Sequence, residues 1–348
     1  MNIRLIGNVK TIMSDPEGAH RYFGWPTIAR LRNGRIAVGA SGYRIEHICP
    51  FGKAVVAFSD DEGESYTQPK AVIDTVLDDR DAGLTVFGES GLIVTSFNNT
   101  LAFQRENMPQ TKECFDYIDS VSAEDEAEAL GCTFRISHDN GETFGEIFKS
   151  RVTSPHGPIV LHDGTILWIG TVYGENEKIE VHTIDPESGK TTFLSSIDTD
   201  GLMLDEPNAI QLTDGKIICH FRIEDENAGI FTLYQAVSDD NGRSWSKPVQ
   251  IIGDDSGAPA HLFRHSSGIL ISAFSRRSFP CGIRVILSSD NGESWSDEFI
   301  IYENRDTDDD LGYPSTTELA DGSLLTAFYS KDREDLPAVI MQQKWCIE

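Results

Sequence analysis

Residues 209–221 read AIQLTDGKIICHF, which is an apolar run, a tight turn ending in Gly215, and a second apolar run. An Asp-Gly pair in this setting predicts a β-hairpin, because the tight turns that join antiparallel strands need positive φ. The same arrangement occurs in five further stretches: ARLRNGRIAVGA (29–40), TVFGESGLIVTSF (85–97), IVLHDGTILWIG (159–170), HLFRHSSGILISAF (261–274) and TTELADGSLLTAFY (316–329). The turn glycines recur every 51 to 73 residues, at Gly34, Gly91, Gly164, Gly215, Gly268 and Gly322. Six copies predict six hairpins of one architecture.

A second repeat, Ser-x-Asp-x-Gly-x-Ser/Thr-aromatic, occurs four times: SDDEGESY (59–66), SHDNGETF (137–144), SDDNGRSW (238–245) and SSDNGESW (288–295). Each copy lies between apolar runs, which predicts a turn between the third and fourth strands of a four-stranded unit. Its Asp can accept backbone N–H bonds and its Gly can take positive φ, while the aromatic residue can pack between units. Calcium binding is the alternative, but one carboxylate per loop is too few for a closed oxygen cage.

Six four-stranded units predict an all-β fold, a six-bladed β-propeller with antiparallel blades that forms a single domain over residues 1–348. Blade six runs out of chain after its third strand, so we expect the amino-terminal IRLIGNVKTI (3–12) to pair with that blade and close the ring. The longest spacing holds an insertion in blade two, residues 98–131. A helix should start at Ser122 and stop at Gly131, and we expect the insertion to act as a lid over the functional rim.

Composition excludes several classes of function. The chain has 29 Lys and Arg against 56 Asp and Glu, a net charge of -27, which would repel nucleic acid and anionic lipid. The sequence contains no run of 18 apolar residues, so no membrane-spanning helix is predicted. The amino terminus lacks the pattern of a secretory signal, so we expect a cytoplasmic protein, with a secreted mature form as the alternative. The six cysteines form no metal-ligand cluster, so we expect no cofactor and reduced thiols, with a Cys114–Cys132 bridge as the exception.

In such a blade the two turn repeats lie on one rim, so polar residues at the other strand ends should converge on the opposite rim. The innermost strands should begin at Trp25, Asp81, His156, Glu206, Pro259 and Tyr313. The second strands should end at Arg44, Glu46, His47, Asn98, Tyr173, Arg222, Arg276 and Arg277, and Arg284 should begin a third strand. This concentration of Arg predicts a pocket for an anionic small ligand. Two structural alternatives are open: the arginines could pair with acids of the next blade, and His156 could be a core histidine.

The second repeat, together with residues 206–222 (EPNAIQLTDGKIICHFR), 282–295 (GIRVILSSDNGESW) and 311–329 (LGYPSTTELADGSLLTAFY), resembles the Asp-box (BNR) repeat propellers of the sialidase (neuraminidase) superfamily over essentially the whole chain. The resemblance implies that Tyr313 is a nucleophile, that Glu206 is its base, and that Arg222 and Arg284 clamp a substrate carboxylate. A neutral phenol suits such a substrate because its carboxylate would repel a carboxylate nucleophile.

Two positions depart from the family pattern. Gly24 stands where the family has its first clamp Arg, and the loop YRIEHICP (43–50) offers Glu46 and His47 in place of the acid/base Asp. The resemblance therefore implies an exo-acting, retaining glycoside hydrolase for an acidic or otherwise modified terminal sugar of a glycan. Remaining substrate contacts would come from Arg44, Asp81, His156, Trp25 and Arg276. A polysaccharide lyase using His47, His156 and Tyr313 on a uronate is the first alternative. A non-catalytic glycan-binding propeller is the second.

Overall fold

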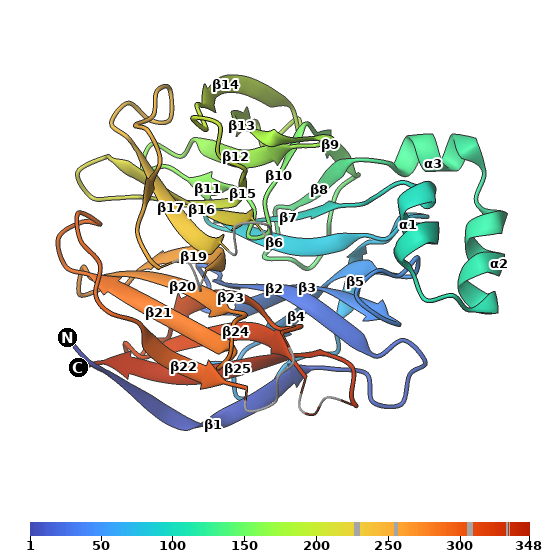
Figure 1. Cartoon of the computed structure of the whole chain (residues 1–348), viewed down its shortest axis with the longest axis horizontal. Coiled ribbons are helices and arrows are strands. Elements are labelled where there is room, and N and C mark those ends of the chain that lie inside the picture. The colour runs from blue at the N-terminus through green and yellow to red at the C-terminus, as the bar shows by residue number, and fades with distance from the viewer. Residues whose placement is uncertain (226–229, 254–256, 305–308, 332, 334) are drawn as a thin grey trace.

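The computed structural model describes residues 1–225, 230–253, 257–304, 309–331, 333 and 335–348 (Figure 1). Its strands form six antiparallel sheets, which confirms the expected six-bladed β-propeller. Blade one consists of β2 (Tyr22–Arg30), β3 (Ile36–Arg44), β4 (Lys53–Ser59) and β5 (Lys70–Ile73); blade two of β6 (Arg80–Phe87), β7 (Gly91–Phe97), β8 (Cys132–Ser137) and β9 (Phe148–Ser150); blade three of β10 (Val152–Thr153), β11 (Ile159–Val160), β12 (Ile166–Val172), β13 (Glu175–Ile184) and β14 (Thr191–Ile197).

The later blades follow the same order from the inside outward. Blade four consists of β15 (Leu204–Gln211), β16 (Ile217–Asp225), β17 (Ile230–Ser238) and β18 (Val249–Gln250); blade five of β19 (Ala258–Arg264), β20 (Leu270–Arg276), β21 (Gly282–Ser288) and β22 (Phe299–Glu303); blade six of β23 (Gly312–Glu318), β24 (Leu324–Ser330), β25 (Val339–Ile347) and β1 (Ile3–Met13). Strand β1 pairs with β25, Ile3 opposite Ile347, so the expected closure of the ring by the amino-terminal strand is confirmed.

Blade three departs from the regular pattern at its innermost strand. That strand is split into β10 and β11, which both pair with β12. Residues 154–158 (SPHGP) lie between the two pieces. Pro155 and Pro158 have no N–H to donate to a ladder, which explains the break.

The four acidic turns share one hydrogen-bond pattern. In the turn at residues 238–245, the Asp240 carboxylate accepts from the Ser238 hydroxyl at 2.9 Å and from the Ser244 amide at 2.8 Å. Equivalent bonds occur at Asp61, Asp139 and Asp290. Hydrogen bonds from Ser or Thr side chains are the main reason that the pKa of each of these carboxyls is lowered to about 2.

The glycine of each acidic turn also packs against the preceding blade. A Cβ atom at Gly292 of blade five would lie 2.4 Å from Ile218 Cδ1 of blade four, and one at Gly242 of blade four would lie 3.0 Å from Leu167 of blade three. Both glycines have positive φ, 79° and 81°. These turns therefore need glycine for close approach between blades as well as for backbone conformation.

The insertion in blade two contains three helices, where the sequence indicated one. They are α1 (Leu101–Asn107), α2 (Lys112–Ser120) and α3 (Ala123–Ala129), seen together beyond the ends of β7 and β8 in Figure 1. The Ser122 hydroxyl caps α3 by accepting from the Asp125 amide at 3.1 Å, as predicted. Met108, Cys114 and Ile118 pack against the apolar residues Ile45, Ile48 and Phe51 of the blade-one loop.

All six cysteines lie within the described residues and are free thiols, five of them buried, so Cys114 and Cys132 are not bridged. None of the three helices in the described part of the chain has the length and apolar character needed to cross a membrane.

Candidate functional site

Four of the residues expected to open innermost strands share an unusual backbone conformation. Trp25, Asp81, Glu206 and Tyr313 have φ angles of 54°, 57°, 49° and 50°. Each lies at an irregularity where the pairing register of its strand shifts. Such bulges re-aim side chains, and non-glycine residues with positive φ cost free energy that is often stored at functional sites. The same device is therefore used in four blades to orient these residues.

Tyr313 begins a chain of polar contacts between blades six and four. Its hydroxyl donates to Glu206 Oε1, and Glu206 Oε2 lies 2.8 Å from Arg222 Nη1. Arg222 also pairs with Glu224. Burial, followed by the nearby charge of Glu206, holds the pKa of Tyr313 well above its usual value, so the phenol is protonated at neutral pH. Glu206, the predicted base, therefore contacts both the predicted nucleophile Tyr313 and one predicted clamp arginine, Arg222.

The second guanidinium beside Tyr313 comes from Arg277. Its Cζ lies 6.0 Å from the Tyr313 ring centroid, and its nitrogens donate to the Leu311 carbonyl at 3.2 Å and to the Tyr329 hydroxyl at 3.3 Å. Arg284, expected there from the resemblance, instead donates to the carbonyls of Tyr302 and Pro280, both at 3.0 Å. Arg284 and Arg276 each lie 3.9 Å from Glu298, so their ion pairs are formed within blade five.

Asp81 lines a cavity of about 380 Å³ together with Asp205, Glu206 and Tyr173. Asp81 is buried, with 6% of its surface exposed. Burial is the largest of the effects that raise its pKa to about 7; Glu206 and Asp205 raise it further, whereas Arg80 and Arg44 lower it. Asn99 and Thr100, where the helical insertion begins, also line this cavity.

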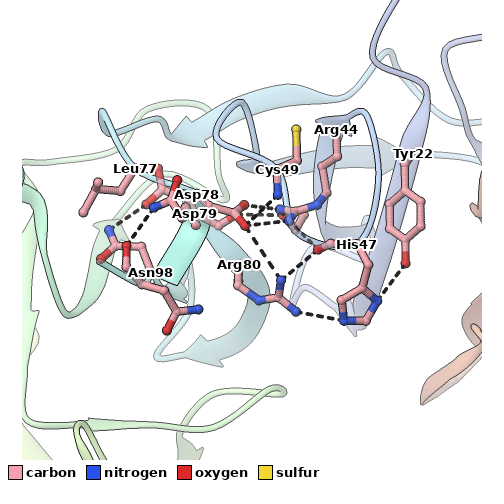
Figure 2. Close-up of polar contacts among 12 residues, drawn as sticks. Tyr22, Arg44, His47, Cys49, Leu77, Asp78, Asp79, Arg80 and Asn98 are labelled. Carbon is pink, nitrogen blue, oxygen red and sulfur yellow. Dashed lines mark hydrogen bonds and ion pairs between the residues drawn. The ribbon is translucent and has the colours of Figure 1, made fainter. Parts of the chain in front are cut away.

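Arg44 was expected to contact substrate, and the structure corrects this expectation. Its side chain has no exposed surface, and its guanidinium binds Asp78 at 2.8 Å and the His47 carbonyl at 2.7 Å. Asp78 also accepts from the Cys49 amide at 3.1 Å. Figure 2 shows the guanidinium groups of Arg44 and Arg80 both directed at Asp78. The acid of blade two thus compensates Arg44, which holds the blade-one loop in place.

Arg80, which no sequence pattern indicated, connects this cluster to Trp25 at the start of an innermost strand. Its Cζ lies 4.3 Å from the Trp25 ring centroid, and its nitrogens donate to the His47 carbonyl at 2.8 Å and to His47 Nε2 at 3.3 Å (Figure 2). Trp25 is 1% exposed and lies under Arg80 and beside the Tyr313 ring, 6.4 Å between centroids. Trp25 was expected to contact substrate, but its ring is enclosed by protein and packs against Arg80 and Tyr313.

His47 and Glu46 line a second cavity, of about 430 Å³, with Tyr22, Asp310 and Lys331. His47 Nδ1 lies 3.4 Å from Asp310 Oδ1 and 3.4 Å from the Tyr22 hydroxyl, which itself donates to Asp310 at 2.9 Å. Burial is the main cause of a lowered pKa for His47. Asp310 was not selected from the sequence, although it lies only three residues before Tyr313.

His156 lies in the interior, in agreement with the alternative that it is a core histidine. It is 3% exposed, its Nδ1 lies 3.1 Å from the Thr27 hydroxyl, and its ring meets His261 with 5.0 Å between centroids. Burial holds its pKa well below the usual value. Pro259, the sixth expected strand start, is also buried. The assignment of His156 to substrate binding is therefore corrected, because packing surrounds it.

Comparisons with known proteins agree with this architecture. Residues 94–326 match the family described as BNR repeat-like domain. No curated protein matches the chain. Solved structures that share its fold include a protein of unknown function from Dyadobacter fermentans, with 16% identity, 99% of both chains covered and a TM-score of 0.79. They also include the intramolecular trans-sialidase from Ruminococcus gnavus in complex with oseltamivir carboxylate (14%, 97% of both chains, 0.65) and the Penicillium chrysogenum α-L-arabinanase complexed with arabinobiose (14%, 98% of both chains, 0.56). At these identities the likeness establishes a common fold.

Proposed function

The chain belongs to the family of BNR repeat-like domains, and on this premise we propose that it is an exo-acting, retaining glycoside hydrolase in which Tyr313 is the nucleophile. The observation that carries the proposal is the contact chain from the Tyr313 hydroxyl through Glu206 to Arg222. A nucleophile within hydrogen-bond reach of a base, which a third group orients, is the arrangement that nucleophilic catalysis requires. The names of the trans-sialidase and the arabinanase that share the fold indicate enzymes that act on sugars, which supports the same class of reaction.

The roles follow from what each side chain can do. Tyr313 attacks the anomeric carbon as its proton passes to Glu206, because a protonated phenol is a weak nucleophile without a base. Arg222 keeps Glu206 oriented through the 2.8 Å contact. A covalent glycosyl-Tyr313 intermediate is then hydrolysed, so the product keeps the anomeric configuration of the substrate.

We propose an acidic or otherwise modified terminal sugar as the substrate. Arg222 is compensated by Glu206 and Glu224, whereas the hydrogen-bond partners of Arg277 in the described part of the chain are the Leu311 carbonyl and the Tyr329 hydroxyl, both neutral. A half-buried guanidinium with neutral partners attracts an anionic group of a ligand. Arg277 lies beside Tyr313, and Arg222 is linked to it through Glu206, but Gly24 supplies no third clamp, which favours a sugar other than sialic acid.

The lyase alternative has less support, since it relied on His156 as well as His47 and Tyr313. His156 is enclosed by Thr27 and His261 in the interior. A catalytic histidine must reach the carbon acid, so this alternative would depend on His47 alone.

The test is release of 4-nitrophenol from a panel of sialosides, uronides and neutral glycosides, followed by variants on the best substrate. Tyr313→Phe and Glu206→Gln should each lower turnover at least about 100-fold, and the double variant should be little worse than the worse single one, because the two residues act as a unit. Tyr66→Phe is the matched control and should leave turnover unchanged. Tyr66 ends the acidic turn at residues 59–66, on the other rim, and its hydroxyl donates to Gln342. Near-normal turnover of Tyr313→Phe, or binding of glycans without any release, would contradict the proposal.

A further inference from the structure

The Asp81 carboxyl differs from the neighbouring acids Asp205 and Asp79 because it accepts no hydrogen bond from the described part of the chain. Asp205 accepts from the Thr171 hydroxyl at 2.6 Å and Asp79 accepts from the Thr75 hydroxyl at 2.9 Å. Among the residues that the structure describes, no hydrogen bond reaches the carboxyl of Asp81, although it is 94% buried and lines the cavity that Glu206 also lines. Buried polar groups are normally hydrogen-bonded, so a buried carboxyl that faces a cavity points to a ligand group in that cavity.

The position of Asp81 matches that of the two residues proposed to do the chemistry. Asp81, Glu206 and Tyr313 occupy equivalent bulges at the start of innermost strands, each with positive φ near 50°. Asp81 and Glu206 line one cavity, and Glu206 accepts the hydrogen bond of the Tyr313 hydroxyl. The charge of Asp81 contributes, after burial and the charge of Glu206, to the raised pKa of Tyr313. Strained backbone at three equivalent positions indicates three side chains held for one site.

The surroundings of Asp81 keep its carboxyl protonated in a fraction of the molecules at neutral pH. Its pKa is raised to about 7 mainly by burial; Asp205 and Glu206 from β15 raise it, and Arg80 from its own strand and Arg44 from β3 lower it. A general acid works best when its pKa is near the operating pH, and glycosidases meet this need with a carboxyl in a buried setting.

His47, which the sequence offered together with Glu46 in place of the acid/base Asp, directs the proton of its neutral ring at Asp310. A guanidinium only donates, so Arg80 Nη2 at 3.3 Å makes His47 Nε2 an acceptor. The proton of the neutral ring is then on Nδ1, which faces Asp310 at 3.4 Å. Glu46 is exposed and lines the cavity of Tyr22 and Asp310 rather than the cavity of Glu206.

We propose that Asp81 is the general acid and base of the reaction, an inference that rests on the proposed glycosidase function. As Tyr313 Oη bonds to the anomeric carbon and gives its proton to Glu206, the bond to the leaving oxygen breaks. That oxygen keeps the electron pair and takes the proton of Asp81. In the second step a water attacks the anomeric carbon and gives a proton to the Asp81 carboxylate. The bond to Tyr313 breaks, and the phenolate takes its proton back from Glu206.

The experiment measures Asp81→Asn on aryl glycosides of one sugar, the one that the wild-type protein releases best from the nitrophenyl panel. Asparagine tolerates positive φ and keeps the shape of the side chain, so the fold should be retained. We expect kcat/KM to fall about 100-fold or more with 4-methylumbelliferyl or alkyl leaving groups and about tenfold or less with 2,4-dinitrophenol, which needs no proton. Azide should restore turnover of the dinitrophenyl glycoside and yield a glycosyl azide of retained configuration.

Matched variants separate this inference from the proposed function. Asp79→Asn removes a neighbouring buried carboxyl that also has a pKa of about 7 but is bonded within the protein, and it should leave the dependence on leaving group unchanged. A loss in Asp81→Asn that is equal for all leaving groups, or a dependence that appears in His47→Asn instead, would overturn the role of Asp81 while Tyr313→Phe still tests the nucleophile. If the wild-type protein released no sugar from any member of the panel, both proposals would fail.

Discussion

The hydroxyl of Tyr173 donates to the main-chain carbonyl of Asn98 at 3.0 Å, so the end of a strand in blade three is bonded to the residue where the insertion of blade two begins. Tyr173 lines the Asp81 cavity, and so does Asn99, the residue that follows Asn98. The insertion is therefore anchored beside the cavity as well as on the blade-one loop.

Loss of this anchor should loosen the insertion. Tyr173→Phe removes one partly buried hydrogen bond, and we expect the free energy of unfolding to fall by about 1 kcal/mol and amide hydrogen exchange to speed up in residues 98–131. Tyr43→Phe removes a comparable bond, from the Tyr43 hydroxyl to the Pro69 carbonyl at 2.9 Å, in blade one. Exchange in residues 98–131 that is equal in both variants would contradict the anchoring role.

The insertion itself should influence substrate selection, as a lid would. Replacing residues 99–130 by a short Gly-Ser link removes Asn99 and Thr100 from the cavity wall and uncovers Ile45, Ile48 and Phe51. We expect KM to rise and the ranking of sugars in the release panel to change. A protein that is less stable but keeps the same KM values and the same ranking would show that the helices only stabilise the blade-one loop.

Arg277 should carry the preference for an acidic sugar. Arg277→Gln keeps a hydrogen-bonding side chain and removes the charge beside Tyr313, so kcat/KM on an acidic glycoside should fall about 10- to 100-fold, the value of one charge-assisted contact. Activity on the matching neutral glycoside should change little. Arg276→Gln is the control, because it removes the adjacent guanidinium, which lies near Glu298. If it lowered kcat/KM as much as Arg277→Gln, Arg276 would contact substrate, as expected from the sequence.

Buried histidines should make the fold sensitive to acid. His220 lies between Ser272 and Gln235, and burial lowers its pKa to about 4; the pKa of His261 is lowered to about 4 in the same way. Since the pKa of an unfolded histidine is about 6.5, the stability that each neutral ring contributes is fully present above that pH and is lost as pH falls from 6.5 to 4, by an amount of the order of 3 kcal/mol per ring.

Urea unfolding of His220→Gln and wild type between pH 7 and pH 4 measures this effect. Asp79 and Asp81 have raised pKa values near 7, so they change stability in the opposite sense over the same pH range. Both proteins contain these acids, so the quantity to compare is the difference in the free energy of unfolding between wild type and His220→Gln. The wild type should lose its advantage over His220→Gln as the pH falls. A difference that does not depend on pH would contradict the prediction.

The turn glycines should differ in their tolerance of a methyl group. At Gly292 a Cβ would meet Ile218 Cδ1 at 2.4 Å, whereas at Gly215 nothing lies within 4 Å, although both residues have positive φ. Gly215→Ala should cost about 1 kcal/mol from backbone strain alone, and Gly292→Ala should cost more, because the buried Ile218 side chain of blade four must also shift. Thermal unfolding of the two variants checks the order, and equal losses would show that packing between the blades adapts without cost.

The fold could be predicted because the chemistry of its turns is local. Asn-Gly and Asp-Gly pairs fix hairpins within a few residues, and the spacing of Gly215 from Gly268 gives the size of a blade. The three helices of the insertion were mostly missed, since Thr100 and Thr111 cap α1 and α2 in a stretch that has no strong periodic pattern.

Residues of the candidate site could be predicted only where their spacing from a turn glycine places them at the start of an innermost strand. Glu206 and Tyr313 lie nine residues before the turn glycines Gly215 and Gly322, and the structure brings them together. Arg277 and Arg284 belong to the same blade, and which of them reaches Tyr313 depends on side-chain directions set by pairing register.

Compensation between blades was equally invisible in the sequence. Arg44 looked available for substrate because Asp78, which neutralises it, lies 34 residues later in the chain. Contacts of this kind are set by packing.

The pairing of β1 with β25 places Ile3 opposite Ile347, and both termini lie at one corner of the molecule (Figure 1). A force that draws the two ends apart would load this first pair of residues and then each following pair in turn, since antiparallel strands held at the same end separate like a zipper. The seam that closes the ring is therefore mechanically weak in that direction, although the same strands are joined along their length. Peeling β1 away would uncover β25 as an edge and leave blade six with three strands, so tension on the two ends should open the propeller at this seam.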